Sequence, residues 1–189
     1  MKQKQTFSHL LAGLAVLLAV LPAVVTFSAV LTALFNKFAW YVWLQATVVP
    51  FEARLVAVLL KLVKISAEIT PGQNFALILN KPGGIFIPVE LQWNCLGWQS
   101  LILLALTLIT GLKGKWKLVS KVEVLILGIA GTFLVNLLRM ALVTSLAYYV
   151  NGGAAMIIHD YFAALIAILW LIFFWWFSYK YILEEASVK

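Results

Sequence analysis

The chain has little charge for its length. Of its 189 residues 11% are charged and 64% are hydrophobic, whereas soluble domains are about 25% charged and about 45 to 50% apolar. This shortage of charge excludes an ordinary soluble domain. We therefore expect an integral protein of the cell membrane that is surrounded by membrane lipids.

Cysteine and histidine are also scarce. Cys95 is the only cysteine, so no intramolecular disulfide can hold the fold together. His9 and His159 are the only histidines, too few for the four-ligand sets typical of structural zinc. We expect no metal and no other cofactor.

The basic residues outnumber the acidic ones, 14 to 7, and the formal net charge is +7. In a soluble protein such a surplus would suggest a nucleic-acid partner. Here the Lys and Arg residues lie beside apolar runs, where they determine topology and contact lipid headgroups. We expect no nucleic-acid partner.

Long apolar runs predict the transmembrane helices, because about 20 apolar residues span a bilayer. The first run exceeds the 7 to 15 residues, roughly, of a cleavable signal-peptide core, and Lys2 and Lys4 precede it. We therefore expect a single all-α membrane domain over 1–189 with about four transmembrane helices. These helices are expected over 10–35, 96–112, 122–149 and 160–179.

Between residues 36 and 94 no stretch of about 20 residues is free of both charge and proline. We expect an amphipathic helix over 50–69 that lies in the outer membrane interface. The alternative is a fifth spanning helix with snorkelling charges, against which Pro50, Glu52 and Arg54 count. The polar stripe of the predicted helix consists of Arg54, Ala57, Lys61, Lys64 and Glu68.

Two β-prone runs, FALIL and GIFIPVELQW, flank the turn sequence NKPGG. They predict a short extracytoplasmic hairpin over 74–93. Such a hairpin would lead directly to Cys95 at the start of the next membrane helix.

A loop rich in lysine, GLKGKWKLVSK, follows that helix and contains no acid. Short loops of this kind lie in the cytoplasm, which puts Cys95 on the outer side. Arg139 follows Val122 by 17 residues, roughly 26 Å along a hydrocarbon core about 30 Å thick, and so lies near the same surface. His159 belongs to the outer turn VNGGAAMIIHD.

Topology thus predicts that Cys95, Arg139 and His159 meet at one membrane depth. Each has a structural explanation when taken alone: a small buried thiol, a snorkelling cation and an interfacial imidazole. Together they are the groups that thiol-based acyl transfer requires. The thiolate is the nucleophile, the imidazole moves the proton, and the guanidinium stabilises the oxyanion.

These residues resemble the exosortases and archaeosortases, which are membrane-embedded cysteine transpeptidases. The resemblance covers roughly Val49 to Phe174. The segment NCLGWQS over 94–100 takes the place of the family's Cys-Ser-Gly motif, NLLR over 136–139 is similar to its Asn-x-x-Arg element, and the pair at 159–160 is similar to its His-Asp element. Supporting roles are expected for Asn136, Asp160, Gly97 and Ser100.

The resemblance implies cleavage of a C-terminal sorting signal on secreted proteins, consisting of a short motif, a transmembrane helix and a basic tail. The acyl group on Cys95 would pass to a lipid or glycan acceptor of the cell envelope. Two departures indicate a divergent, short member. Leu96 replaces the usual Ser, and Ala163 stands near a position where Gly is common.

Two other functions remain open from the sequence. One is a non-catalytic membrane subunit or small transporter in which Arg139 holds an anion, although the spans contain too few polar residues for a continuous path. The other is a simple hydrolytic membrane cysteine protease that releases the acyl group to water.

Overall fold

A computed structural model describes residues 26, 29–30, 32–34, 36–70, 75–150 and 152–185. The chain divides into two compact units, Met1–Ala39 and Trp40–Lys189. Most of the predicted first helix over 10–35 lies outside the described residues. The second unit contains the candidate site and is described below.

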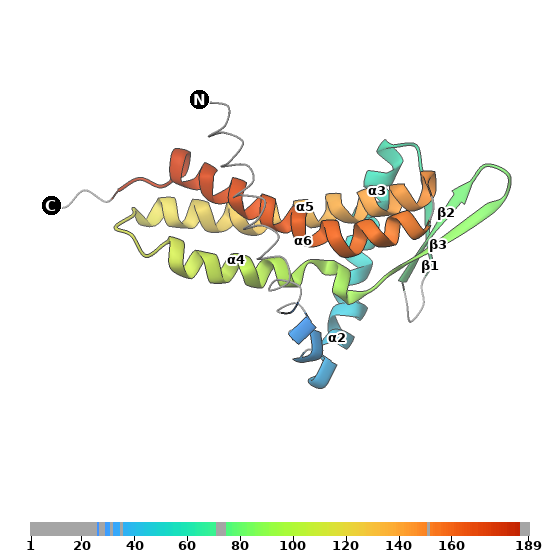
Figure 1. Ribbon diagram of the computed structural model, residues 1–189, viewed down its shortest axis with the longest axis horizontal. Helices are drawn as coiled ribbons and strands as arrows, with labels where there is room; N and C mark the ends of the chain where they lie inside the picture. The colour runs from blue at the N-terminus through green and yellow to red at the C-terminus, as the bar shows by residue number, and fades with distance from the viewer. Residues whose placement is uncertain are drawn as a thin grey trace, which may run out of the picture. The chain divides into compact units, whose positions relative to one another are not determined.

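The second unit consists of helices and one small antiparallel sheet (Figure 1). It begins with a helical arm made of α2, the π-helix η1 and α3, and then forms three strands, a 3₁₀ turn η2 and three apolar helices. In chain order the elements are α2 (Trp40–Trp43), η1 (Leu44–Val48), α3 (Val49–Leu62), β1 (Ser66–Thr70), β2 (Phe75–Lys81), β3 (Ile85–Leu91), η2 (Trp93–Leu96), α4 (Trp98–Gly111), α5 (Leu118–Tyr149), α6 (Gly152–Phe177) and η3 (Ser178–Ile182).

The arm replaces the predicted interface helix over 50–69 and ends earlier, at Leu62. Pro50 lies in the first turn of α3, directly after the π-helix η1, and both a proline and a π-bulge mark irregular points in a helix. Lys64 then adopts a left-handed conformation with φ 61°, and β1 follows. The last predicted helical turn was therefore wrong, because residues 66–69 form a strand with alternating exposure.

One face of α3 is buried and the other is exposed. Its buried side chains include Val56 and Leu60, both fully buried, whereas Leu62 is 77% exposed. Ala57, predicted on the polar stripe, is buried as well. Exposed apolar side chains on a helix are typical of contact with lipid.

The predicted hairpin over 74–93 is present as β2 and β3, and β1 adds a third strand on the far side of β2. Gly83 and Gly84 make the turn with φ values of 94° and 76°, which residues with a Cβ adopt only under strain. Leu77, Leu79 and Leu91 are buried in the core. The strand β3 leads directly into the turn that contains Cys95.

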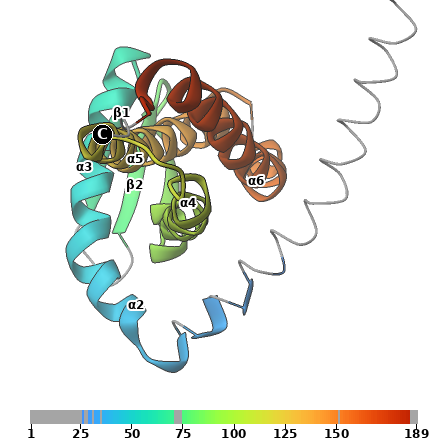
Figure 2. The ribbon, with the colours of Figure 1, turned by 90° about the vertical axis from the view of Figure 1, so that its left-hand side faces the viewer.

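Helices α4, α5 and α6 lie side by side, and α3 runs across their direction (Figures 1 and 2). A Cβ on Gly128 of α5 would lie 3.1 Å from Phe174 of α6 and 3.2 Å from Leu104 of α4. Small residues of this kind allow apolar helices to approach closely. Phe174 and Leu104 belong to a core cluster that also contains Leu108, Val124 and Leu183.

The helix ends differ from the predicted ones. The helix predicted over 96–112 begins at Trp98, and the one predicted over 122–149 begins at Leu118. The last helix, predicted from 160, already begins at Gly152. The expected outer turn VNGGAAMIIHD is therefore almost entirely helical, since only two residues, 150 and 151, separate α5 from α6.

The C-terminal segment returns to the lysine-rich loop between α4 and α5. The Lys117 backbone N–H donates to the Glu184 carbonyl at 2.9 Å, and the Lys117 ammonium binds the Glu184 carboxylate. The hydrogen bond from the Lys117 ammonium and its positive charge hold the pKa of Glu184 below its usual range. The two polar segments thus lie together at one end of the helices.

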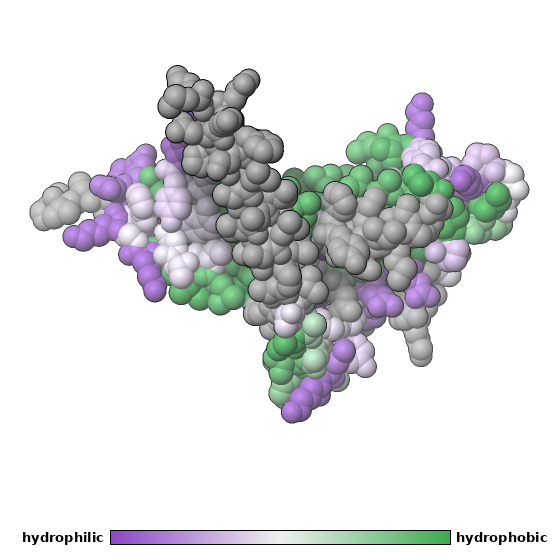
Figure 3. Space-filling view, viewed as in Figure 1, coloured by the Kyte–Doolittle hydropathy of each residue, from purple (hydrophilic) through white to green (hydrophobic). Residues whose placement is uncertain are grey.

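Three of the described helical segments are long and apolar enough to cross a membrane: Tyr41–Leu62, Leu118–Tyr149 and Leu165–Ile182. By length and composition, the first agrees with the alternative of a spanning helix over this region. Helix α4 is apolar but shorter, with 14 residues. Figure 3 shows hydrophilic residues gathered at the end with the lysine-rich loop, with hydrophobic surface along α4.

Replacing Leu104 by Ala should destabilise the helical core. The side chain is 1% exposed, so its loss leaves a cavity between α4, α5 and α6. We expect the free energy of unfolding in detergent to fall by about 2 kcal/mol or more. Leu106→Ala, on the same helix but 49% exposed, is the matched control and should leave it nearly unchanged. Equal losses for the two variants would contradict this core.

Candidate active site

Cys95 lies in the short 3₁₀ turn η2 between β3 and α4. Its backbone N–H donates to the Gln92 carbonyl at 2.8 Å. Gly97 then adopts a left-handed conformation with φ 68° and is the N-cap of α4. The cysteine was predicted at the very start of a helix over 96–112. It belongs instead to a separate turn, because the left-handed Gly97 interrupts helical geometry.

Two side chains of α5 donate hydrogen bonds to the backbone carbonyl of Cys95. The Arg139 Nη2 lies 2.9 Å from that oxygen, and the Asn136 Nδ2 lies 3.0 Å from it. Three-residue spacing puts both donors on one face of the helix. The structure therefore brings Asn136 and Arg139 to Cys95, although they lie 41 and 44 residues after it in the sequence.

A carboxylate from α3 joins this group. Glu52 is 3% exposed, and its Oε2 accepts a hydrogen bond from the Asn136 Nδ2 at 3.3 Å. Arg139 interacts electrostatically with both the Glu52 carboxyl and the Cys95 thiol. Sequence reasoning did not assign Glu52 to the site. The signal that could have found it is an acid in an apolar helix of a chain that also carries an intramembrane arginine.

Gln45 of η1 is a second residue that sequence reasoning missed. Its Nε2 donates to the Leu91 carbonyl at 3.2 Å, and its Oε1 accepts from the Trp93 N–H at 2.8 Å. One side-chain amide thus holds the backbone on both sides of Gln92, just before the cysteine turn. Nothing in the local sequence around Gln45 signals this role.

Aromatic rings cover the same turn. Trp93 and Trp98 stack with ring centroids 5.5 Å apart, and Tyr41 lies 6.0 Å from Trp93. Both tryptophans are 7% exposed. These rings shield the turn on one side, while Cys95 remains half-buried.

Gly97 packs directly on Asn136. A Cβ at this position would lie 2.6 Å from the Asn136 Cγ, a distance at which the amide must move. Glycine is therefore required twice, for its left-handed backbone and for its contact with the donor side chain.

Described residues line two cavities next to the site. Ser100, Asn136 and Arg139 line a small one of about 10 Å³ together with Ile166, Ala167 and Trp170 of α6. Thr132 also lines it, and its hydroxyl accepts a hydrogen bond from the Trp170 indole at 2.9 Å. A larger, mainly apolar cleft of about 180 Å³ lies on the other side, where Glu52 is the one charged residue in a lining of Leu44, Val48, Leu96, Gly97, Trp98, Leu101, Thr132 and Phe133.

The side chains of His159 and Asp160 lie outside the described residues, so their place in the site stays a prediction. Their backbones belong to α6.

The chemistry of the described site is that of a thiol beside a cation and an acid. Over the part of the chain that the structure describes, no three His, Cys, Asp or Glu side chains gather where they could hold a metal ion. The partly buried guanidinium can stabilise negative charge on sulfur or on a substrate oxygen, because few solvent dipoles compete with it.

No family model, no curated protein and no solved structure matches this chain.

Gly97→Ala should disrupt the site more than an equally strained substitution elsewhere. Gly84 has a similar φ of 76°, but a Cβ there meets nothing within 4 Å. Left-handed strain costs Ala about 1 to 2 kcal/mol at either position, so Gly84→Ala isolates the strain. We expect Gly97→Ala to lower the thermal midpoint further and to raise the alkylation rate of Cys95, measured with a maleimide. Identical behaviour of the two variants would contradict the packing of Gly97 on Asn136.

Proposed function

We propose that the protein is a membrane cysteine transpeptidase of the exosortase and archaeosortase type. It cleaves a C-terminal sorting signal of secreted proteins on the outer face of the cell membrane. The acyl group on Cys95 then passes to a cell-envelope acceptor, a lipid or a glycan. The observation that carries this proposal is the convergence of Asn136 and Arg139 on the cysteine turn.

The reaction begins with attack of the Cys95 thiolate on the carbonyl carbon of the scissile peptide bond. Arg139 supports this step because its positive charge stabilises the thiolate and then the oxyanion of the tetrahedral intermediate. Only one of its five N–H donors is needed for the Cys95 carbonyl. His159 takes the thiol proton and gives it to the leaving amine, as the family resemblance implies. Collapse breaks the C–N bond and leaves a thioester.

The acceptor then attacks the thioester and gives its proton to His159, the C–S bond breaks, and the Cys95 thiolate is regenerated. An apolar cleft beside the cysteine turn supports acyl transfer to a membrane-borne acceptor, because it keeps water away from the thioester. A protease without an acceptor would hydrolyse the same intermediate and release a free carboxylate.

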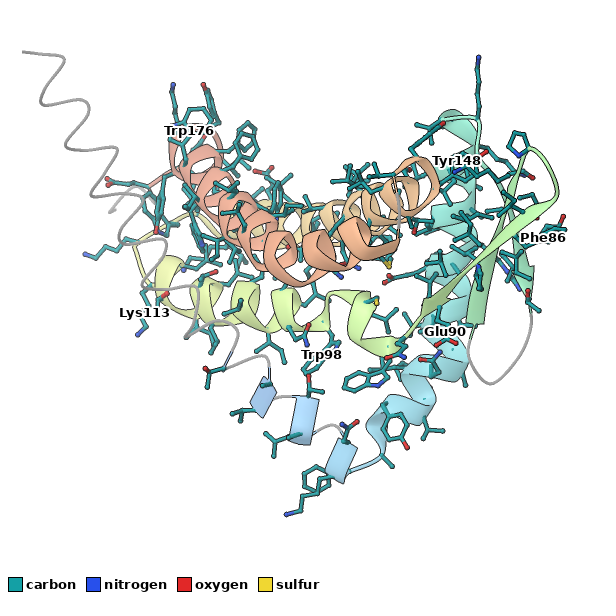
Figure 4. The ribbon with its side chains drawn as sticks, turned by 45° about the vertical axis from the view of Figure 1, so that its right-hand side comes forward. Phe86, Glu90, Trp98, Lys113, Tyr148 and Trp176 are labelled. Atoms are coloured by element: carbon teal, nitrogen blue, oxygen red, sulfur yellow. The ribbon has the colours of Figure 1, made fainter. Side chains whose placement is uncertain are left out.

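The membrane arrangement in this proposal has four transmembrane helices: the predicted one over 10–35, α4, α5 and α6. The arm lies in the outer interface, and its direction across α4, α5 and α6 supports that placement (Figures 1 and 2). In Figure 4, Lys113 and Trp98 mark opposite ends of α4. Because loops rich in lysine face the cytoplasm, the end with Trp98 and Cys95 faces outward.

The depth of the site follows from the length of α4. Its 14 residues reach about 21 Å, less than the roughly 30 Å of the hydrocarbon core. Cys95 therefore lies within the outer half of the membrane rather than in bulk water. A dry site of this kind strengthens the interaction between the guanidinium and the developing oxyanion.

Processing of a sorting signal tests the function. The chain is co-expressed with a secreted protein of the same genome that ends in a motif, an apolar helix and a basic tail. Cys95→Ala should abolish processing, and Arg139→Gln should slow it by about 10²- to 10³-fold, as for loss of one oxyanion donor. Arg54→Gln is the matched control, because Arg54 is exposed on α3, and should process normally.

The size of the product and the mass of its C-terminus provide the readout. Attachment of an acceptor to the new C-terminus identifies a transpeptidase, and a free carboxylate identifies a protease. Full processing by Cys95→Ala would end both proposals.

A further inference from the structure

Glu52 is the buried titratable group that neither the family resemblance nor the mechanism above uses. We propose that Glu52 is a positioning residue of the Cys95 site. Its carboxylate holds the Asn136 amide and the Arg139 guanidinium in place, and it shares the charge of Arg139 with the thiol. The inference rests on the proposed function only in so far as Cys95 is the nucleophile.

The Asn136 amide gives the first line of evidence. Its Nδ2 lies 3.0 Å from the Cys95 carbonyl oxygen and 3.3 Å from the Glu52 Oε2. An amide nitrogen has two hydrogens, so each of these acceptors can receive one. Reversing the amide would bring its oxygen against two acceptors, which is unfavourable. Glu52 therefore fixes which end of Asn136 meets the cysteine turn.

The charge of Arg139 gives the second line of evidence. The titratable groups that the structure places around its guanidinium are the Glu52 carboxyl and the Cys95 thiol. Among the residues that the structure describes, Glu52 is the only buried acid. A cation in an apolar helix is expensive without a partner, and this carboxylate is the buried acid that the described residues provide. The part of the Arg139 positive charge that Glu52 neutralises cannot also stabilise the Cys95 thiolate.

The course of the arm gives the third line of evidence. Gln45 belongs to η1 and Glu52 to α3, the element that follows η1 in the arm. Gln45 holds the backbone before Cys95, and Glu52 accepts a hydrogen bond from Asn136, one of the two donors to the Cys95 carbonyl. Val49 lies between them and is 1% exposed. The arm thus forms one wall of the site, and its docking places both polar side chains at once.

Alkylation of Cys95 tests this role without a substrate. The rate of reaction with iodoacetamide is measured from pH 5 to 10 on the full chain in detergent, for the wild type, Glu52→Gln, Glu52→Asp and Glu90→Gln. Glu90 is an exposed glutamate of β3 and makes the matched control. Folding of each variant is checked by size-exclusion chromatography.

Removal of the carboxylate charge should leave more of the Arg139 charge for the thiolate. We expect the midpoint of the alkylation profile to fall by about 1 pH unit in Glu52→Gln, the lower part of the range for removal of a nearby like charge. Glu52→Asp keeps the charge but withdraws it by one methylene, so its midpoint should lie between the two. Glu90→Gln should match the wild type.

A folded Glu52→Gln variant with the wild-type midpoint would overturn the proposal. If Glu52→Gln does not fold, Glu52→Asp decides: a lowered midpoint supports the role, and a wild-type midpoint overturns it. If Glu52→Gln shifts the alkylation profile but the wild-type chain processes no sorting signal, the positioning role stands and the transpeptidase proposal is wrong. If the profile does not shift and processing is normal, only the role of Glu52 is wrong.

Discussion

The carbonyl oxygen of Cys95 is the point on which the site depends. It accepts hydrogen bonds from Asn136 and Arg139, and one of these donors carries a full charge. A hydrogen bond to a charged group contributes about 1.5 to 3 kcal/mol to the free energy of unfolding. A buried polar group that loses its hydrogen-bond partner costs about as much. The turn after β3, the polar face of α5 and the buried acid of α3 are therefore stable only together. The fold and the proposed function thus depend on the same hydrogen bonds to the Cys95 carbonyl.

This dependence explains why irregular backbone is tolerated among apolar helices. A 3₁₀ turn followed by a left-handed glycine leaves backbone groups that lipid cannot satisfy. Here side chains satisfy them: Gln45 binds the strand end, and α5 binds the turn itself. The arrangement keeps the thiol half-buried beside a guanidinium. A low local dielectric then makes that charge effective, which a solvated surface pair would not be.

The apolar runs were sufficient to predict α4, α5 and α6, because helix existence follows from composition over many residues. The three-residue spacing of Asn136 and Arg139 puts them on one face of any helix, so their proximity needs no tertiary information. The sequence could not reveal Glu52, whose contact with Asn136 spans 84 positions and whose charge counted only as an argument against a spanning helix. The strand β1 was missed because SAEIT is short and follows a helix without proline or glycine. The early start of α6 was missed because its two glycines are typical of turns.

The central claim is that Cys95 carries the acyl group. It is tested most directly by quenching the wild-type chain in acid during processing of a sorting-signal substrate and measuring the mass of the peptide that contains Cys95. The account predicts an added mass equal to the N-terminal product, released by hydroxylamine and absent from the Cys95→Ala variant. Accumulation of processed product in a single turnover, while the Cys95 thiol stays unmodified throughout, would contradict it.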